Sequence, residues 1–161
     1  MELLYHVTPD DSVIGSVDRN LAHAEGLLHR SGVVFVVDSK GRVLLQHRSP
    51  SKKIFPNCFE SSCAFHVAYG ENYEAAASRE LKEETGVSAQ LTFVGKFSHQ
   101  DPPENQIVAV FRCNSSLRIT IDPSEATNAQ FYDKTEVDNI VNSKTVTPWL
   151  RDGWKLVRDK I

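Results

Sequence analysis

Continuous apolar stretches in the middle of the chain predict the centre of a β-sheet. Residues 32–37 form an apolar run rich in β-branched side chains, which is typical of a strand buried on both faces. Residues 38–41 have the composition of a turn, so residues 43–47 are expected to return as the neighbouring strand. Shorter apolar segments predict further strands at residues 3–7, 13–17, 91–97, 107–113, 117–121 and 130–132.

Three segments later in the chain have helical patterns. Residues 73–85 are rich in helix formers, follow the favourable N-cap Asn72 and precede Gly86, which readily takes the left-handed conformation that ends a helix. Residues 134–141 are expected to form a short helix. Residues 148–160 begin with a proline and carry bulky apolar side chains at helical spacing, which predicts a C-terminal helical segment.

Length and composition indicate one domain over residues 1–161. A chain of 161 residues is long enough for a single core, and 40% hydrophobic with 24% charged residues is ordinary for a globular domain. No repeat or linker divides the sequence. With an N-terminal hairpin over about residues 1–20, a mixed sheet and helices on both sides of it, the predicted fold class is α/β, of the α+β type.

Charge and cysteine content restrict the partners and the compartment. The net charge is −3, whereas a protein that mainly binds a nucleic-acid polymer needs a basic surface. The three cysteines are odd in number and include no Cys-x-x-Cys pair, which argues against a disulfide scaffold or a zinc ribbon. Neither a signal peptide nor a membrane-spanning apolar run is visible. We therefore expect a cytoplasmic monomer or homodimer that engages no membrane.

The candidate chemistry lies in the predicted helix over residues 73–85. Glu80, Glu83 and Glu84 fall within an arc of about 100° around the helix axis. Like charges at these spacings repel by roughly a few tenths of a kcal/mol per pair, and Lys82 points to the other side. Such hard oxygen ligands suit Mg²⁺ or Mn²⁺, so the pattern predicts a cation on this face. A solvated acidic face is the alternative interpretation.

This segment resembles the Nudix box, which is a Gly, five residues, a Glu, seven residues, then Arg-Glu-aliphatic-x-Glu-Glu-x-Gly-aliphatic. The box spans residues 65–87 here. Glu71 and residues 79–87 match it, whereas Phe65 stands in place of the opening Gly, a departure that concerns the loop before the helix and not the metal ligands. The resemblance implies an α/β/α sandwich and Mg²⁺-dependent hydrolysis of a small-molecule diphosphate.

The resemblance also implies roles for individual residues. The metal ligands that it implies are Glu80, Glu83, Glu84 and Glu71. Glu83 or Glu104 would take the proton of the attacking water, with Asp101 as a weaker candidate. Arg79 is expected to orient the glutamates by salt bridges, and Gly86 is expected to be structural.

A second resemblance, to type 1 isopentenyl diphosphate isomerase, covers about residues 22–149. The motifs that carry it are Gly26-Leu27-Leu28-His29-Arg30, Leu44-Leu45-Gln46-His47-Arg48-Ser49, Phe55-Pro56-Asn57-Cys58-Phe59 and Thr147-Pro148-Trp149. It implies that Arg48 and Lys52 bind the diphosphate and that Trp149 forms an apolar wall beside the organic group. Alternatively, Arg48 and Lys52 are solvated loop charges and Trp149 is a core residue.

Two positions argue against isomerase chemistry. In these isomerases a cysteine two residues before a histidine and a glutamate of a Glu-x-Glu pair move the proton, and here Ala64 and Gln106 occupy those positions. Neither side chain can carry out that proton transfer. We therefore expect a hydrolase acting on a nucleoside or isoprenoid diphosphate. The alternatives are a residual isomerase that uses Cys63 after a local shift, and a catalytically silent diphosphate-binding module.

Several histidines suggest a second metal site. His29 and His66 match two of the isomerase metal ligands, Glu104 matches one carboxylate, and His23 could supply a third imidazole. Imidazoles with one carboxylate suit Zn²⁺ or Mn²⁺ better than Mg²⁺. Alternatively, these histidines are structural residues at strand ends.

Overall fold

A computed structural model describes all residues from 1 to 161. The strands are β1 (Leu3–Val7), β2 (Val13–Asp18), β3 (His29–Val37), β4 (Val43–Arg48), β5 (Phe59–Glu60), β6 (Cys63–His66), β7 (Thr92–Asp101), β8 (Glu104–Asn114) and β9 (Ala126–Tyr132). The helices are α1 (Arg19–Glu25), α2 (Tyr73–Thr85), α3 (Lys134–Ser143) and α4 (Pro148–Val157), followed by the 3-10 turn η1 (Arg158–Lys160). No helix is both long and apolar enough to cross a bilayer.

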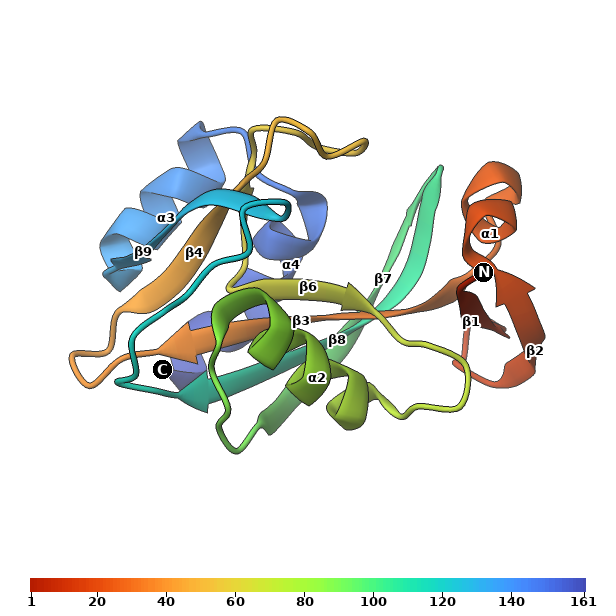
Figure 1. Ribbon diagram of the computed structural model, residues 1–161, viewed down its shortest axis with the longest axis horizontal. Helices are drawn as coiled ribbons and strands as arrows, with labels where there is room; N and C mark the ends of the chain where they lie inside the picture. Colours follow the sequence, from red (N-terminus) through yellow and green to blue (C-terminus); the bar gives the residue numbers. More distant parts are fainter.

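One nine-stranded mixed sheet is built around β3 (Figure 1). β3 pairs in parallel with β8 along its whole length and antiparallel with β6, and it also contacts β1 and β4. The remaining strands extend the sheet, β7 next to β8, β9 and β5 next to β4, and β2 next to β1. The continuous apolar run predicted for a central strand is therefore the strand with the most partners.

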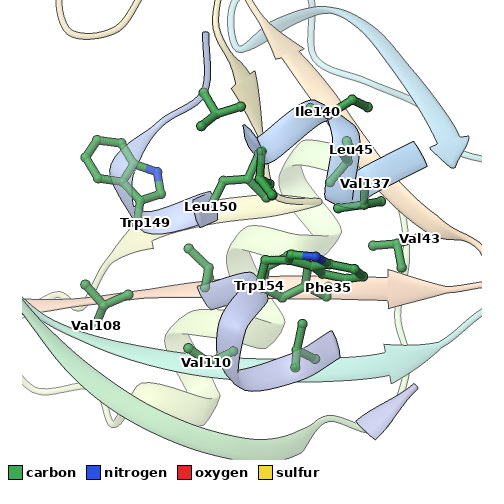
Figure 2. Packing of buried hydrophobic residues seen from close by; sticks show 14 residues of the cluster. Phe35, Val43, Leu45, Val108, Val110, Val137, Ile140, Trp149, Leu150 and Trp154 are labelled. Atoms are coloured by element: carbon green, nitrogen blue, oxygen red, sulfur yellow. The ribbon is translucent and has the colours of Figure 1, made fainter. Parts of the chain in front are cut away.

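Helices cover both faces of the sheet, as the α/β/α arrangement requires. α2 packs on one face, where Ala77 and Leu81 meet Val34 and Val36 of β3. α3 and α4 cover the other face, where Trp149, Leu150 and Trp154 pack on alternate residues of β3, β4 and β8 (Figure 2). Because side chains alternate along a strand, β3 supplies both cores at once.

Most predicted elements are confirmed, and three local departures have physical reasons. α2 has the predicted bounds, with the Asn72 side chain capping Ala75 N and with Gly86 at φ 75°. α1 follows the N-terminal hairpin and was not predicted; its seven residues are too few for a clear periodic signal. Strands β5 and β6 were also not predicted, because they have only two and four residues.

The strand predicted at residues 117–121 is wrong. Leu117 is 59% exposed, and the segment pairs with no strand. Instead, Thr120 N donates to Thr85 O and Asp122 N donates to Glu84 O, so the segment satisfies carbonyl groups in the last turn of α2. The alternating apolar residues therefore reflect contact with a helix end, and not membership of the sheet.

Phe65, which replaces the opening glycine of the box, lies on β6 directly opposite Gly32 of β3. A Cβ atom at Gly32 would overlap the Phe65 ring and approach Ala109 O to 3.0 Å. The phenyl ring therefore occupies space that exists because the neighbouring strand carries glycine there. Gly32 explains how the chain accommodates a bulky residue at a position where the box has none.

We expect Gly32→Ala to lower the free energy of unfolding by about 1–3 kcal/mol, because the added methyl group overfills a packed core. Urea denaturation measures this loss. In a Phe65→Ala background the same substitution should be better tolerated, since the ring that it meets is gone. An equal loss in both backgrounds would contradict the assignment of the overlap to Phe65.

Candidate active site

Helix α2 holds its acidic side chains in place through one arginine. The Arg79 guanidinium donates from Nε to Glu71 at 2.8 Å and from Nη1 to Glu80 at 2.6 Å, and it lies 3.5 Å from Glu83. These contacts are the salt bridges expected for Arg79. The hydrogen bond from Arg79 holds the pKa of Glu71 below its ordinary value, so this carboxylate is charged.

Glu84 lies in a different environment from the other acidic residues of the helix. Its side chain is buried and accepts a 3.3 Å hydrogen bond from Gln46 Nε2, whereas the Glu83 side chain is 59% exposed. Burial, with the nearby charges of Glu125, Glu80 and Glu60, raises the pKa of Glu84 to about 8. As metal ligands, Glu83 and Glu84 are both expected to face solvent, and for Glu84 this prediction is wrong.

The carboxylates of α2 have the chemistry of a hard-cation site. Burial also raises the pKa of Glu80, although Arg79 opposes this effect. Glu80 is partly buried, and Glu84 is buried and has no basic partner. Such carboxylates are unstable as anions unless a cation is close by. Oxygen ligands of this kind fit Mg²⁺ or Mn²⁺.

A carboxylate from outside the box, which no sequence pattern indicates, also lies near Glu84. Glu125 precedes β9, its Oε2 accepts a 2.6 Å hydrogen bond from Lys52 Nζ, and its carbonyl accepts from Ser49 N. It is the largest electrostatic influence on Glu84 after burial. Glu125 lies 41 positions beyond Glu84 and outside the box, so only the fold reveals their proximity.

The predicted histidine cluster is assembled by strand register. His29 pairs with Gln106 across β3 and β8, and Ser31 pairs with His66 across β3 and β6. Helix α1 adds His23, and β8 begins at Glu104. The ligand atoms of the four residues all lie within 4.8 Å of one another, and the residues are His23, His29, His66 and Glu104.

The protonation state of this cluster suits a metal ion. His29 Nδ1 lies 2.8 Å from Leu27 O, a contact in which Nδ1–H donates, so Nε2 keeps its lone pair. His29 Nε2 and Glu104 Oε1 are buried without a hydrogen-bond partner. Burial lowers the pKa of His29 to about 4 and that of His66 well below its ordinary value, so both imidazoles are neutral at pH 7. The Nε2 atoms of His23 and His66 lie 3.3 Å apart, within hydrogen-bond distance, so the free lone pair is that of His29. A neutral imidazole with a free lone pair fits a transition metal.

The two positions that carry the proton in isomerases are inert in this arrangement. The Gln106 amide accepts a 2.8 Å hydrogen bond from Ser31 Oγ and donates to Glu104. Ala64 lines a cavity next to the histidine cluster, whereas Cys63 packs among the apolar residues under α2. Adjacent strand residues point to opposite faces, so Cys63 faces away from Ala64, and burial raises its pKa well above the ordinary value.

A cavity of about 560 Å³ lies between the histidine cluster and the loop after β4. Its volume is typical of a small-molecule site. Arg19, Lys52 and Lys53 make part of its lining basic, and Ala64 and Trp149 provide apolar surface. Glu125 also lines the cavity, whereas the box glutamates of α2 do not. Asp101 is exposed at the tip of the β7–β8 hairpin and does not line it.

Arg48 and Lys52 both have protein partners. Arg48 donates from Nε to Phe55 O at 3.1 Å and from Nη2 to Ile54 O at 2.8 Å, so it anchors the loop after β4. A two-pronged contact from Arg48 to a phosphate would require giving up one of these bonds. Lys52 is paired with Glu125 at the edge of the cavity. Neither residue is a freely solvated loop charge.

Trp149 combines the two roles considered for it. Its side chain is 7% exposed and belongs to the core under α4 (Figure 2), and its ring also lines the cavity. The indole lies 5.4 Å from the Phe55 ring and 6.3 Å from the His99 ring, both edge to face. Core packing therefore holds this wall of the cavity rigid.

Comparison with known proteins agrees with the geometry. A family model described as the NUDIX domain matches residues 27–151. The isopentenyl-diphosphate Delta-isomerase of Serratia proteamaculans is 44% identical over 99 residues, which cover 62% of this chain and 55% of that relative. The chain thus spans little more than half the length of that isomerase.

Two further comparisons cover nearly the whole chain. The prenyl-diphosphate phosphatase of Methanosarcina mazei is 31% identical over 157 residues, which cover 94% of this chain and 92% of that relative. A crystal structure of a Deinococcus radiodurans protein superposes with a TM-score of 0.82 at 24% identity, covering 96% of this chain and 99% of that one. The structural likeness supports the fold assignment alone.

Replacing Glu84 with Gln is expected to stabilise the metal-free protein above about pH 5 and to leave it unchanged in acid. The folded-state pKa of about 8 exceeds the ordinary value of 4.5, so the folded protein binds a proton that the unfolded chain has released. Wild-type stability should therefore fall as the pH rises from 4.5 to 8, and Gln should remove that slope. Urea denaturation in a chelator at several pH values measures it.

The control for this experiment is Glu74→Gln, because Glu74 lies on the same helix but is exposed. Its pH dependence should follow that of the wild type. If Glu84→Gln shows the wild-type slope as well, the buried charge at Glu84 is not responsible for it.

Proposed function

Because the chain belongs to the NUDIX domain family, we propose that it is a metal-dependent enzyme that hydrolyses a diphosphate linkage in a small molecule. The observation that supports this best is the group of Glu80, Glu83 and Glu84 on one helix, with Glu84 buried and lacking a basic partner. These three residues, with Glu71 in support, would hold Mg²⁺ or Mn²⁺. Such an ion neutralises charge on the diphosphate and makes a nearby water more acidic.

The reaction itself is the displacement of one phosphate group by water. The water oxygen attacks phosphorus, the bridging P–O bond breaks, and the leaving phosphate departs with the bonding electrons. Glu83 is the preferred acceptor of the water proton, because its exposed carboxylate has only a 3.5 Å contact with Arg79. Glu104 is the weaker candidate, since it is buried and hydrogen-bonded to Gln106. Arg79 fixes the carboxylates around it.

The cavity is the proposed binding site for the substrate. We place the diphosphate at the edge formed by Lys52 and Glu125, the part of the cavity that acts electrostatically on Glu84. The organic group would lie against Ala64 and Trp149. An apolar wall of this kind favours an isoprenoid over a nucleoside, and the Methanosarcina relative that covers nearly the whole chain is named a prenyl-diphosphate phosphatase. We expect no nucleic-acid polymer or membrane as partner.

Isomerisation of isopentenyl diphosphate is the second candidate function. The name of the Serratia relative and the persistence of the histidine cluster favour it. Against it, Ala64 and Gln106 occupy the proton-transfer positions, and Cys63 lies under α2. A catalytically silent binding module is less favoured still, because the carboxylates of the box are complete.

The histidine cluster supports the proposal of a second metal. His23, His29, His66 and Glu104 would hold Zn²⁺ or Mn²⁺, since His29 Nε2 and Glu104 Oε1 are buried without a hydrogen-bond partner. Such a metal would fix α1 to the ends of β3, β6 and β8. This role is separate from the chemistry proposed for α2.

With Mg²⁺ present, the wild type should release phosphate from a prenyl diphosphate, and Glu83→Gln should lower turnover by roughly 100-fold or more. The amide cannot accept the water proton, while Glu83 is exposed enough for the fold to tolerate it. Phosphate release under saturating substrate measures the effect. Glu74→Gln, an exposed change on the same helix, should keep wild-type turnover. Full activity in Glu83→Gln would rule out its role as base.

The same samples distinguish hydrolysis from isomerisation. In heavy water, isopentenyl diphosphate should gain no deuterium, because no side chain at positions 64 and 106 can exchange the proton. Incorporation that Cys63→Ala abolishes would favour the isomerase instead.

Protein purified without a histidine tag is expected to take up Zn²⁺ or Mn²⁺ at the histidine cluster. The His29→Ala, His66→Ala double variant should lose that ion, whereas His47→Ala, outside the cluster, should keep it. Elemental analysis measures the bound metal, and thermal denaturation measures the stabilisation that it gives. If the wild type holds no transition metal even after both ions are offered, the histidines are structural.

A further inference from the structure

Two walls of the cavity come from distant parts of the chain, and one buried carboxylate joins them. Glu60 of β5 is 3% exposed. Its Oε2 accepts a 2.5 Å hydrogen bond from Trp149 Nε1 of α4 and lies 3.5 Å from Arg48 Nη1 of β4. Glu60 thus contacts both the indole wall and the arginine that anchors the loop after β4.

The other carboxylate oxygen is also fully engaged. Glu60 Oε1 accepts from Ser61 N at 2.7 Å, from Ser61 Oγ at 2.9 Å and from Thr147 Oγ1 at 3.1 Å. Thr147 is the N-cap of α4, so Glu60 fixes the start of the helix that carries Trp149. Burial raises the pKa of Glu60, and Arg48, Trp149 and Ser61 oppose that effect.

Each partner of Glu60 controls a different part of the cavity. Trp149 is the apolar wall itself. Arg48 binds the carbonyl groups of Ile54 and Phe55, and thereby sets the position of the loop that carries Lys52 and Lys53. Loss of the Glu60 carboxylate would therefore leave the wall and the basic loop free to move independently of each other.

We propose that Glu60 is a positioning residue that fixes the indole wall and the basic loop of the cavity relative to each other, and so sets the affinity for a diphosphate. The proposal rests on the proposed function in one respect, that the ligand of the cavity carries a diphosphate. Glu60 itself does not line the cavity, so it acts only through Trp149 and Arg48.

The chain contains a matched control for this arrangement. Asp138 accepts from Trp154 Nε1 at 2.8 Å and from Arg158 Nε and Nη2 at 2.8 and 2.7 Å. The chemistry is the same, a carboxylate between an indole and a guanidinium, but none of these residues lines the cavity. Trp154 is the only other tryptophan of the chain, so its replacement leaves Trp149 as the sole indole reporter.

The test compares Glu60→Gln with Asp138→Asn. Glutamine replaces one carboxylate oxygen of Glu60 with an NH₂ group, which cannot accept a hydrogen bond. At least one of the buried donors around Glu60 therefore loses its acceptor. Calorimetry with inorganic diphosphate and Mg²⁺ should show binding weakened at least tenfold in Glu60→Gln and unchanged in Asp138→Asn. With a prenyl diphosphate, KM should rise more than kcat falls. In a Trp154→Phe background, Glu60→Gln should also shift the fluorescence emission of Trp149.

If Glu60→Gln does not fold, Glu60→Asp provides the same test. Aspartate keeps the carboxyl group and its two oxygens but is one methylene shorter, so it cannot reach Trp149 and Arg48 together. Its effects should have the same direction and be smaller.

Wild-type affinity for diphosphate together with unchanged Trp149 emission in these Glu60 variants would overturn the proposal. An equal loss of binding in Asp138→Asn would overturn it too, because the effect would then follow general stability. If the wild-type protein binds no diphosphate, the proposed function is contradicted instead. The fluorescence emission of Trp149 in the Glu60 variants would then still decide whether Glu60 holds the indole wall in place.

Discussion

The register of β3 against β6 and β8 is the constraint on which the candidate site depends. It places His29 beside Gln106 and Ser31 beside His66, so that residues from three separate parts of the sequence meet at one end of the sheet. A slip of one residue would turn every side chain to the opposite face. The two cores make such a slip costly, because β3 is buried on both sides.

The same alternation separates two kinds of chemistry. On β6, Cys63 packs under α2 and Ala64 and His66 line the cavity, while Phe65 packs in the core under α2 and also reaches the cavity. Gln46 of β4 points toward α2 and reaches Glu84, whereas its neighbour Leu45 enters the core under α4. The carboxylates of the box therefore lie on α2, whereas His23 and His66 line the cavity together with Glu104 and Glu125.

Sequence patterns predicted what is local or periodic and missed what depends on distant contacts. The bounds and caps of α2 could be read from Asn72 and Gly86, because capping involves neighbouring residues only. The burial of Glu84 could not, since it arises from Gln46 and from the segment before β9. Glu60 and Glu125 belong to no motif, and only the folded chain brings them to Trp149 and Lys52.

Under the proposed function, the difference between hydrolase and isomerase lies in very few side chains. Ala64 and Gln106 lack a transferable proton, yet both keep the packing of their strands: Ala64 contacts the core under α4, and Gln106 stays bonded to Ser31 and Glu104. Neither residue disturbs the ligands on α2. The two chemistries would share the cavity but use different reactive groups, the carboxylates of α2 for hydrolysis and the side chains at positions 64 and 106 for isomerisation, so replacing the latter leaves the former in place.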